Sequence, residues 1–201
     1  MKIVLKKGCL CLMLWCVVFL ANLAADRAVL RQDVVRLHVV GASNGEVDQE
    51  IKLQVRDAVL ETLEQEMTGV TDASQAKDWI AAHLPLIEEA ANDALAAAGS
   101  GDRAAASLRT EAFPQRIYDT FSLPAGLYDA LRITIGAGEG RNWWCVVFPS
   151  LCIPETTDGF ADVAAGAGFS EDLTAALTEG YQVRFFLLDL LGQMENFFHG
   201  T

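Results

Sequence analysis

Residues Arg141–Cys152, with the sequence RNWWCVVFPSLC, combine two tryptophans, two cysteines and a continuous apolar run. A glycine-rich turn, Gly136–Gly140, precedes them, and a strand-like segment, Leu127–Ile135, precedes the turn. The incoming segment alternates apolar and polar residues, as in a half-covered strand. The outgoing segment is apolar on both faces, as in a strand that is buried on both sides or offers one face to a partner. This pattern predicts a β-hairpin over about residues 127–148 that ends at Pro149.

The remaining periodicity predicts an α+β fold: a single compact domain with a mixed or antiparallel sheet and two or three packing helices. Val34–Val40 alternates as a first strand. Ser43 and Glu46 fit a capping box for a helix that buries Val47 and ends near Met67. The other expected elements are a helix from Asp72 to about Ala98 that Pro85 breaks or kinks, and strands over Ala104–Thr110 and Arg116–Leu123.

The N-terminus has the layout of a secretory signal. Met1–Lys7 is basic, Gly8–Leu20 is an apolar run of 13 residues, and Ala21–Ala25 is rich in small residues. Residues 1–25 are therefore either a signal peptide that is removed or an anchor that tethers the chain to a membrane through residues 3–25. In both cases the domain that follows, residues 26–153, faces outward.

The net charge and the spacing of motifs argue against several partners and chemistries. The formal net charge is −12. An acidic surface repels phosphate backbones and anionic lipid headgroups, so we expect no nucleic acid partner. The three histidines, His38, His83 and His199, do not stand at metal-ligand spacing, so we expect no metal. Gly136–Gly140 follows a strand but opens no helix and lacks the dinucleotide-binding spacing, so we expect no cofactor.

Cys145 and Cys152 are the two cysteines outside the N-terminal apolar run. Six residues separate them, and an extended strand would hold their Cα atoms ~23 Å apart. A disulfide requires less than about 7 Å, so a bridge needs the chain to reverse at Pro149 and Ser150. A disulfide and a pair of buried thiols both remain open.

Two constellations represent an enzymatic alternative, a secreted hydrolase. Cys145 and His38 would form a thiol nucleophile pair, but burial in an apolar strand raises the pKa of a thiol. Asp119 and Asp129 would supply paired carboxylates, but both flank a turn and are typical of solvated loop acids. We expect no catalytic residues.

Beyond the hairpin, residues 154–180 are rich in Gly, Ala and Thr and predict a loop or linker with a short helix at Glu171–Thr178. Residues 181–198 predict a helix with a broad apolar stripe, which packs on the domain or lies against a membrane or partner. The expected apolar face consists of Val183, Phe186, Leu187, Leu190, Leu191 and Met194, and Phe185, Leu188, Phe197 and Phe198 widen it.

Several motifs resemble the stage II sporulation protein R family over roughly residues 34–153. They are Arg36-Leu37-His38-Val39-Val40, Leu123-Pro124-Ala125-Gly126, Ala130-Leu131-Arg132, Asn142-Trp143-Trp144-Cys145 and Leu151-Cys152. The resemblance implies a small signal of endospore-forming bacteria, made in the forespore and exported into the space between the forespore and mother-cell membranes. There it would activate a membrane-embedded aspartic protease that cleaves the pro-sequence from a sigma-factor precursor. It implies no enzymatic turnover by the chain itself.

The expected hairpin offers candidates for the contact with that protease. Tryptophan, tyrosine and arginine dominate the binding energy of many interfaces. The candidate residues are Trp143, Trp144, Tyr128, Phe148 and Arg116. The alternative is that both tryptophans pack in the core, as large aromatic residues in strands commonly do.

Overall fold

A computed structural model of the 201-residue chain describes residues 2–118, 120–149, 164–166, 169–178 and 183–199. Its centre is a mixed four-stranded sheet with the strand order β2-β5-β1-β6. The strands are β1 (Val35–Val40), β2 (Ala104–Phe113), β5 (Gly126–Ile135) and β6 (Asn142–Phe148). Strand β1 runs parallel to β5 and antiparallel to β6, and β2 runs antiparallel to β5. The α+β prediction with a mixed sheet is confirmed.

The predicted hairpin is wrong, because β1 lies between β5 and β6 and pairs with both. All six residues of β1 are buried, so this strand takes a central position under cover on both faces. The glycine-rich turn crosses the end of β1, where Gly140 N–H donates to the Gly41 carbonyl at 2.8 Å. A Cβ atom on Gly140 would lie 2.3 Å from the Ser43 carbonyl oxygen, so only glycine allows this approach.

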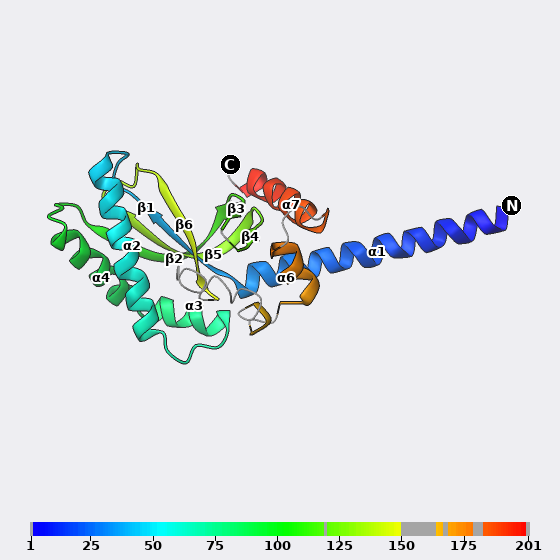
Figure 1. Ribbon diagram of the computed structural model, residues 1–201, viewed down its shortest axis with the longest axis horizontal. Coiled ribbons are helices and arrows are strands. Elements are labelled where there is room, and N and C mark those ends of the chain that lie inside the picture. Colours follow the sequence, from blue (N-terminus) through cyan, green and yellow to red (C-terminus); the bar gives the residue numbers. More distant parts are fainter. Residues whose placement is uncertain (1, 119, 150–163, 167–168, 179–182, 200–201) are drawn as a thin grey trace.

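One face of the sheet is covered by α2 (Glu46–Glu66), α3 (Ala73–Ala82) and α4 (Leu84–Ala97) (Figure 1). The predicted break at Pro85 is confirmed, since Pro85 lies in the first turn of α4. Asp72 caps α3 as expected and accepts from Gln75 N–H at 2.9 Å. The core on this side is apolar and contains Leu37, Val55, Ile80, Ile87, Leu131 and Ile133.

The start of α2 departs from the predicted capping box. Its N-cap is Gly45, and the Ser43 hydroxyl accepts from Gly45 N–H at 3.0 Å instead of capping the helix. Val47, expected on the buried face, is 68% exposed because it lies in the first turn, which projects beyond the sheet.

The opposite face of the sheet is covered at one end by several short elements. They are the last turns of α1 (Lys2–Asp33), the strand pair β3 (Arg116–Ile117) and β4 (Ser122–Leu123), α6 (Glu171–Thr178) and α7 (Val183–His199). The single strand predicted over residues 116–123 is wrong, because the chain reverses and Tyr118 N–H donates to the Phe121 carbonyl. The helix predicted at Glu171–Thr178 is present, whereas residues 154–163, 167–168 and 179–180 of the expected linker lie outside the described part.

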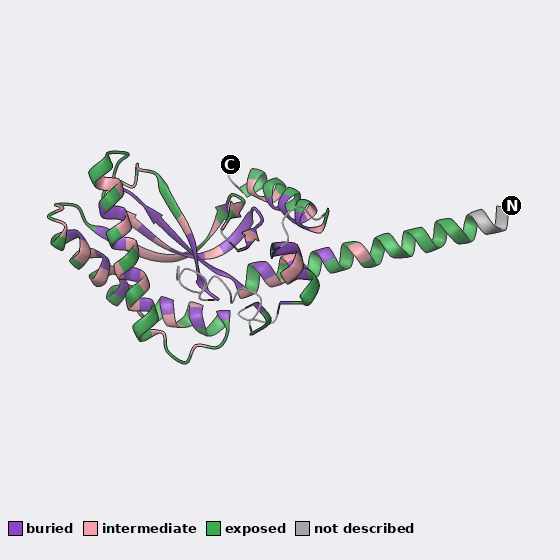
Figure 2. Ribbon diagram, viewed as in Figure 1, coloured by how far each residue is buried: buried purple, intermediate pink, exposed green. Residues whose placement is uncertain are grey.

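Helix α1 continues without interruption through the predicted boundary at residue 25. Its first part projects away from the domain and is exposed, whereas Leu23 and Leu30 pack into the core (Figures 1 and 2). The segment Lys6–Asp33 is long and apolar enough to cross a membrane, with a mean hydropathy of 2.2 over an 18-residue window, and a signal sequence has the same properties. The apolar helix thus fits a signal or a membrane anchor.

Helix α7 packs on the domain, as one of the two alternatives predicted, but through the edge of the widened stripe instead of its centre. Phe185, Leu188 and Gly192 are on the buried side, and Asp189 accepts from Ala125 N–H at 2.7 Å. A Cβ atom on Gly192 would lie 1.6 Å from the Ala125 carbonyl oxygen, so the helix backbone rests directly on this turn. The exposed residues include most of the expected apolar face: Val183, Phe186, Leu190, Leu191, Met194, Phe197 and Phe198.

Candidate partner-binding face

Trp143 and Trp144 extend from opposite faces of β6, because side chains alternate along a strand. Trp143 lies on the side that α2 covers, where the Arg56 guanidinium stands 4.4 Å from the centre of its ring. Arg56 also pairs with Asp57 at 2.6 Å. Trp143 is 36% exposed, and its cation–π contact attaches it to the helical layer.

Trp144 lies on the opposite side and belongs to an aromatic cluster. Its ring stacks on His38 with the ring centres 3.8 Å apart and meets Phe113 edge-on at 4.7 Å. The Arg116 guanidinium stands 5.6 Å from its ring centre. Of the five candidates, Trp144 and Arg116 are therefore brought together.

Tyr128 and Phe148 do not reach the surface, with exposed fractions of 2% and 8%, so neither forms part of an exposed aromatic patch. Tyr128 donates to the Pro124 carbonyl at 2.8 Å, and burial raises the pKa of its phenol to about 12. A shift of register between β1 and β6 places Phe148 with the core under the helices, on the other side from Val146. The strict alternation assumed from the sequence misses this bulge.

No local pattern predicted that Arg36 would be buried. Its side chain is fully buried, with Nε donating to the Cys145 carbonyl at 3.0 Å and Nη2 to the Tyr118 hydroxyl at 2.8 Å. Among the described residues no carboxylate contacts this guanidinium, and Nη1 has no hydrogen-bond partner. Burial lowers the pKa of Arg36. The aromatic rings of Phe113 and Tyr128, at 4.5 and 5.1 Å, supply part of the stabilisation that a carboxylate would give.

Glu111 is the acid at the centre of the neighbouring charged network. It contacts His38 Nδ1 at 2.6 Å, accepts from Arg109 Nε, and lies 3.4 Å from Arg132 Nη1. Burial works to raise the pKa of Glu111, but the hydrogen bonds from His38 and Arg109 and the nearby positive charges outweigh it and lower the pKa to about 2. The other ring nitrogen of His38 lies 3.0 Å from the Asn142 side-chain oxygen.

These side chains form one surface, which we call the arginine face. It comprises Ser107, Arg109 and Glu111 on β2, Arg116 on β3, Arg132 and Thr134 on β5, His38 on β1, and Asn142 and Trp144 on β6. His38 is buried beneath it, Arg109 and Asn142 are exposed, and Arg132, Thr134 and Trp144 are half-buried. The face is thus open to a partner, whereas the Arg36 cluster beside it is closed by α1, β3 and α7.

The thiol pair considered for a hydrolase does not form. Cys145 lies in the core under the helices, whereas His38 lies on the opposite side of the sheet. Cys145 is disulfide-bonded, and Cys9, Cys11 and Cys16 are free. Cys152 lies outside the described residues, so its pairing with Cys145 stays a prediction.

Only one acid of the carboxylate pair considered for a hydrolase lies among the described residues. Asp129 pairs with Lys77 at 3.2 Å and accepts from Thr110, and Asp119 lies outside the described residues. Across the described part of the chain, no group of three His, Cys, Asp or Glu residues is arranged to hold a metal.

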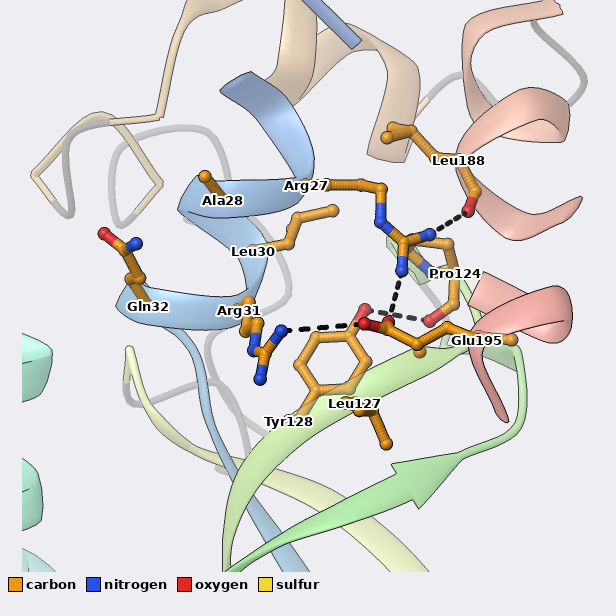
Figure 3. Close-up of a pocket in the computed structure, with 12 residues that line it drawn as sticks. Arg27, Ala28, Leu30, Arg31, Gln32, Pro124, Leu127, Tyr128, Leu188 and Glu195 are labelled. Carbon is orange, nitrogen blue, oxygen red and sulfur yellow. Dashed lines mark hydrogen bonds and ion pairs between the residues drawn. The ribbon is translucent and has the colours of Figure 1, made fainter. Parts of the chain in front are cut away.

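A pocket of about 310 Å³ lies between the end of α1, the start of β5 and α7 (Figure 3). Two arginines of α1 line it and both pair with Glu195 of α7: Arg27 by a direct hydrogen bond and Arg31 at 3.6 Å. Nearby, Arg184 of α7 binds Asp26 through two hydrogen bonds of 2.6 and 2.9 Å. Because these charges pair with one another, the pocket is part of the ion-paired contact that holds α7 against α1.

The comparisons with known proteins agree with the resemblance. The family model described as stage II sporulation protein R matches residues 31–158. A protein of Bacillus subtilis (strain 168) named stage II sporulation protein R is 28% identical over 186 residues, which cover 83% of each chain. No solved structure matches. The arginine face and the Arg36 cluster lie within the matched residues, and the chain belongs to the stage II sporulation protein R family.

Proposed function

We propose that this chain is an extracytoplasmic signalling protein of endospore formation that activates a membrane-embedded aspartic protease. The protease then removes the pro-sequence of the mother-cell sigma factor. Membership of the family supports a role in sporulation. In this proposal the chain is a ligand without catalytic turnover, and it acts in the space between the forespore and mother-cell membranes.

The observation that carries the proposal is the direct connection between the apolar helix and the domain. Helix α1 enters the fold without a flexible linker, and its ion pairs with α7 fix its last turns. Gly8–Ala25 would extend ~27 Å as a helix, close to the thickness of the hydrocarbon core of a bilayer. If the helix stays attached, the domain is presented at a fixed height above the membrane, within reach of a membrane-embedded partner.

The arginine face is the surface that we assign to this contact. It combines a partly exposed tryptophan with arginines, the residue types that dominate interface energies. Trp143 is excluded from this assignment because it lies on the opposite side of the sheet, against Arg56.

Co-expression of the chain with the protease and the sigma-factor precursor in a non-sporulating host tests the proposal. We expect cleavage of the precursor when residues 1–201 are exported. We expect none when the apolar run Gly8–Leu20 is deleted and the domain stays in the cytoplasm. Absence of cleavage, with all three proteins detected and the chain exported, would refute the activating role.

The N-terminal mass of the exported chain decides between signal and anchor. An intact residue 1 would show an uncleaved anchor. A mature chain beginning near Asp26 would show a released domain that keeps the Asp26–Arg184 ion pair but loses the buried contact of Leu23.

A further inference from the structure

We propose that the arginine face binds an acidic peptide segment of the partner, with carboxylates at Arg109, Arg116 and Arg132 and an apolar side chain against Trp144. This inference rests on the proposed function for the identity of the partner, but its chemistry follows from the face itself.

Charge distinguishes this face from the rest of the molecule. The chain has 15 Lys and Arg residues against 27 Asp and Glu. Nevertheless, Arg109, Arg116 and Arg132 gather on one side of the sheet, where Arg109 and Arg132 share one acid among the described residues, Glu111, and Arg36 is buried beside them. An acidic segment is repelled by most of the surface and attracted here, which steers its approach and fixes its position.

The arginines also have binding capacity that the fold does not use. Arg116 Nε is buried and has no hydrogen-bond partner among the described residues. Arg132 is held in place by Thr134 at 3.1 Å, and its contacts to Glu111 are long, at 3.4 and 3.5 Å. Buried polar groups are nearly always paired, and a guanidinium matches the geometry of a carboxylate. A carboxylate from the partner would pair with the guanidinium nitrogens of Arg116 and Arg132 that stay accessible, because both side chains are only half-buried, whereas Arg116 Nε itself is enclosed.

The aromatic part of the face supplies a site for an apolar side chain. His38 covers one side of the Trp144 ring, and the ring remains half-buried instead of enclosed. The Glu111–His38 contact and the stacking fix the ring orientation before binding, so little side-chain entropy is lost. A segment with Asp or Glu residues near a large apolar residue fits this surface.

The face lacks lysine, which allows a direct chemical test. Arg109→Lys and Arg116→Lys keep the positive charge and introduce an amine that a zero-length carbodiimide reagent couples to a carboxylate in contact. Arg116 is the sharper position, because no acid contacts its guanidinium among the described residues. Arg56→Lys is the matched control, since it also stands beside a tryptophan but on the other side of the sheet.

Each full-length variant is co-expressed with the protease, and the membranes are treated with the reagent. Mass spectrometry then locates the coupled residues. We expect coupling from Arg109→Lys or Arg116→Lys to Asp or Glu residues of the protease, about tenfold or more above the Arg56→Lys level, as for a defined contact. Variants that trigger cleavage normally but couple no more than Arg56→Lys would overturn the inference.

Two other results distinguish the binding of an acidic segment from the proposed function. Coupling only to a second copy of this chain would assign the face to self-association and overturn the inference. Coupling to acidic residues of a different membrane protein, without precursor cleavage by the wild-type chain, would keep the acidic segment and refute the proposed function.

Discussion

The two faces of the sheet differ in how they are built. Under α2–α4 the core is formed by aliphatic side chains such as Leu37, Leu131 and Ile133. On the other face, Arg36, His38 and Glu111 are buried or nearly so among aromatic rings. Burial of charge costs free energy, so a face that keeps it is a poor source of stability compared with an apolar one. The comparison supports the proposal that the helical face chiefly stabilises the fold and that the arginine face on the other side serves recognition.

The largest stability effect is expected in the helical core. Leu37→Ala removes a fully buried side chain and should lower the free energy of unfolding by about 3 to 4 kcal/mol. Val47→Ala, at an exposed position, should change it by less than about 0.5 kcal/mol. Urea unfolding of the detergent-solubilised chain measures both. Equal losses would show that Val47 packs as the sequence pattern predicted.

A somewhat smaller loss is expected where α7 closes the second face. Gly192→Ala places a methyl group against the Ala125 carbonyl, so α7 must shift, at a cost of about 3 kcal/mol or less. Gly166→Ala is the control, because a Cβ atom there meets none of the described residues within 4 Å. Thermal unfolding compares the two. An unchanged midpoint for Gly192→Ala would contradict the close docking of α7.

The charged network predicts a specific acid sensitivity. The pKa of Glu111 is lowered from 4.5 to about 2, so the folded state binds fewer protons than the unfolded state between these values. Stability from this carboxylate is therefore present above about pH 4.5 and lost as the pH falls through 2, amounting to roughly 3 kcal/mol. Urea titrations at several pH values should show a shallower loss over this range for Glu111→Gln.

Glu50→Gln is the control for that titration, since Glu50 lies on the exposed surface of α2. It should keep the wild-type loss of stability. If Glu111→Gln also keeps it, the network around His38 does not hold the carboxylate in its charged form.

The smallest effect is expected at Trp143. Truncation to Ala removes a partly exposed ring together with its cation–π contact to Arg56. That contact is worth about 1 kcal/mol or less. Precursor cleavage in the co-expression assay should be unchanged. Loss of cleavage with an unchanged unfolding midpoint would move the partner contact to the helical side of the sheet.

Local sequence patterns predicted most of the helices and strands but not which strands pair in the sheet. The two-residue period located β1, β2 and β5, and Asp72 and Pro85 marked the helix boundaries. The place of β1 between β5 and β6 depends on pairing between segments far apart in the sequence. The short glycine turn favoured the simpler hairpin in the absence of that information.

Of the five candidate residues, Trp144 and Arg116 lie together on the arginine face, and Trp143 lies on the other side of the sheet. Tyr128 and Phe148 were expected at the surface and are buried, and partner binding by any of the five stays a prediction. A bulge changed the direction of Phe148, and Tyr128 is enclosed because α1 and α7 pack over the start of β5. The roles of Asp189 and Gly192 were missed because they depend on one turn, at Ala125, that the sequence does not connect to α7. The sequence feature that could have indicated these roles is an acid and a glycine within an otherwise apolar helix.

The most direct test of the account compares arginines on the two faces. The double variant Arg109→Gln, Arg132→Gln is set against Arg56→Gln in the precursor-cleavage assay, with the unfolding midpoint of each measured. The account predicts that the double variant loses cleavage by about tenfold or more while it stays folded, and that Arg56→Gln cleaves normally. Normal cleavage by a folded double variant would contradict the claim that the arginine face binds the partner.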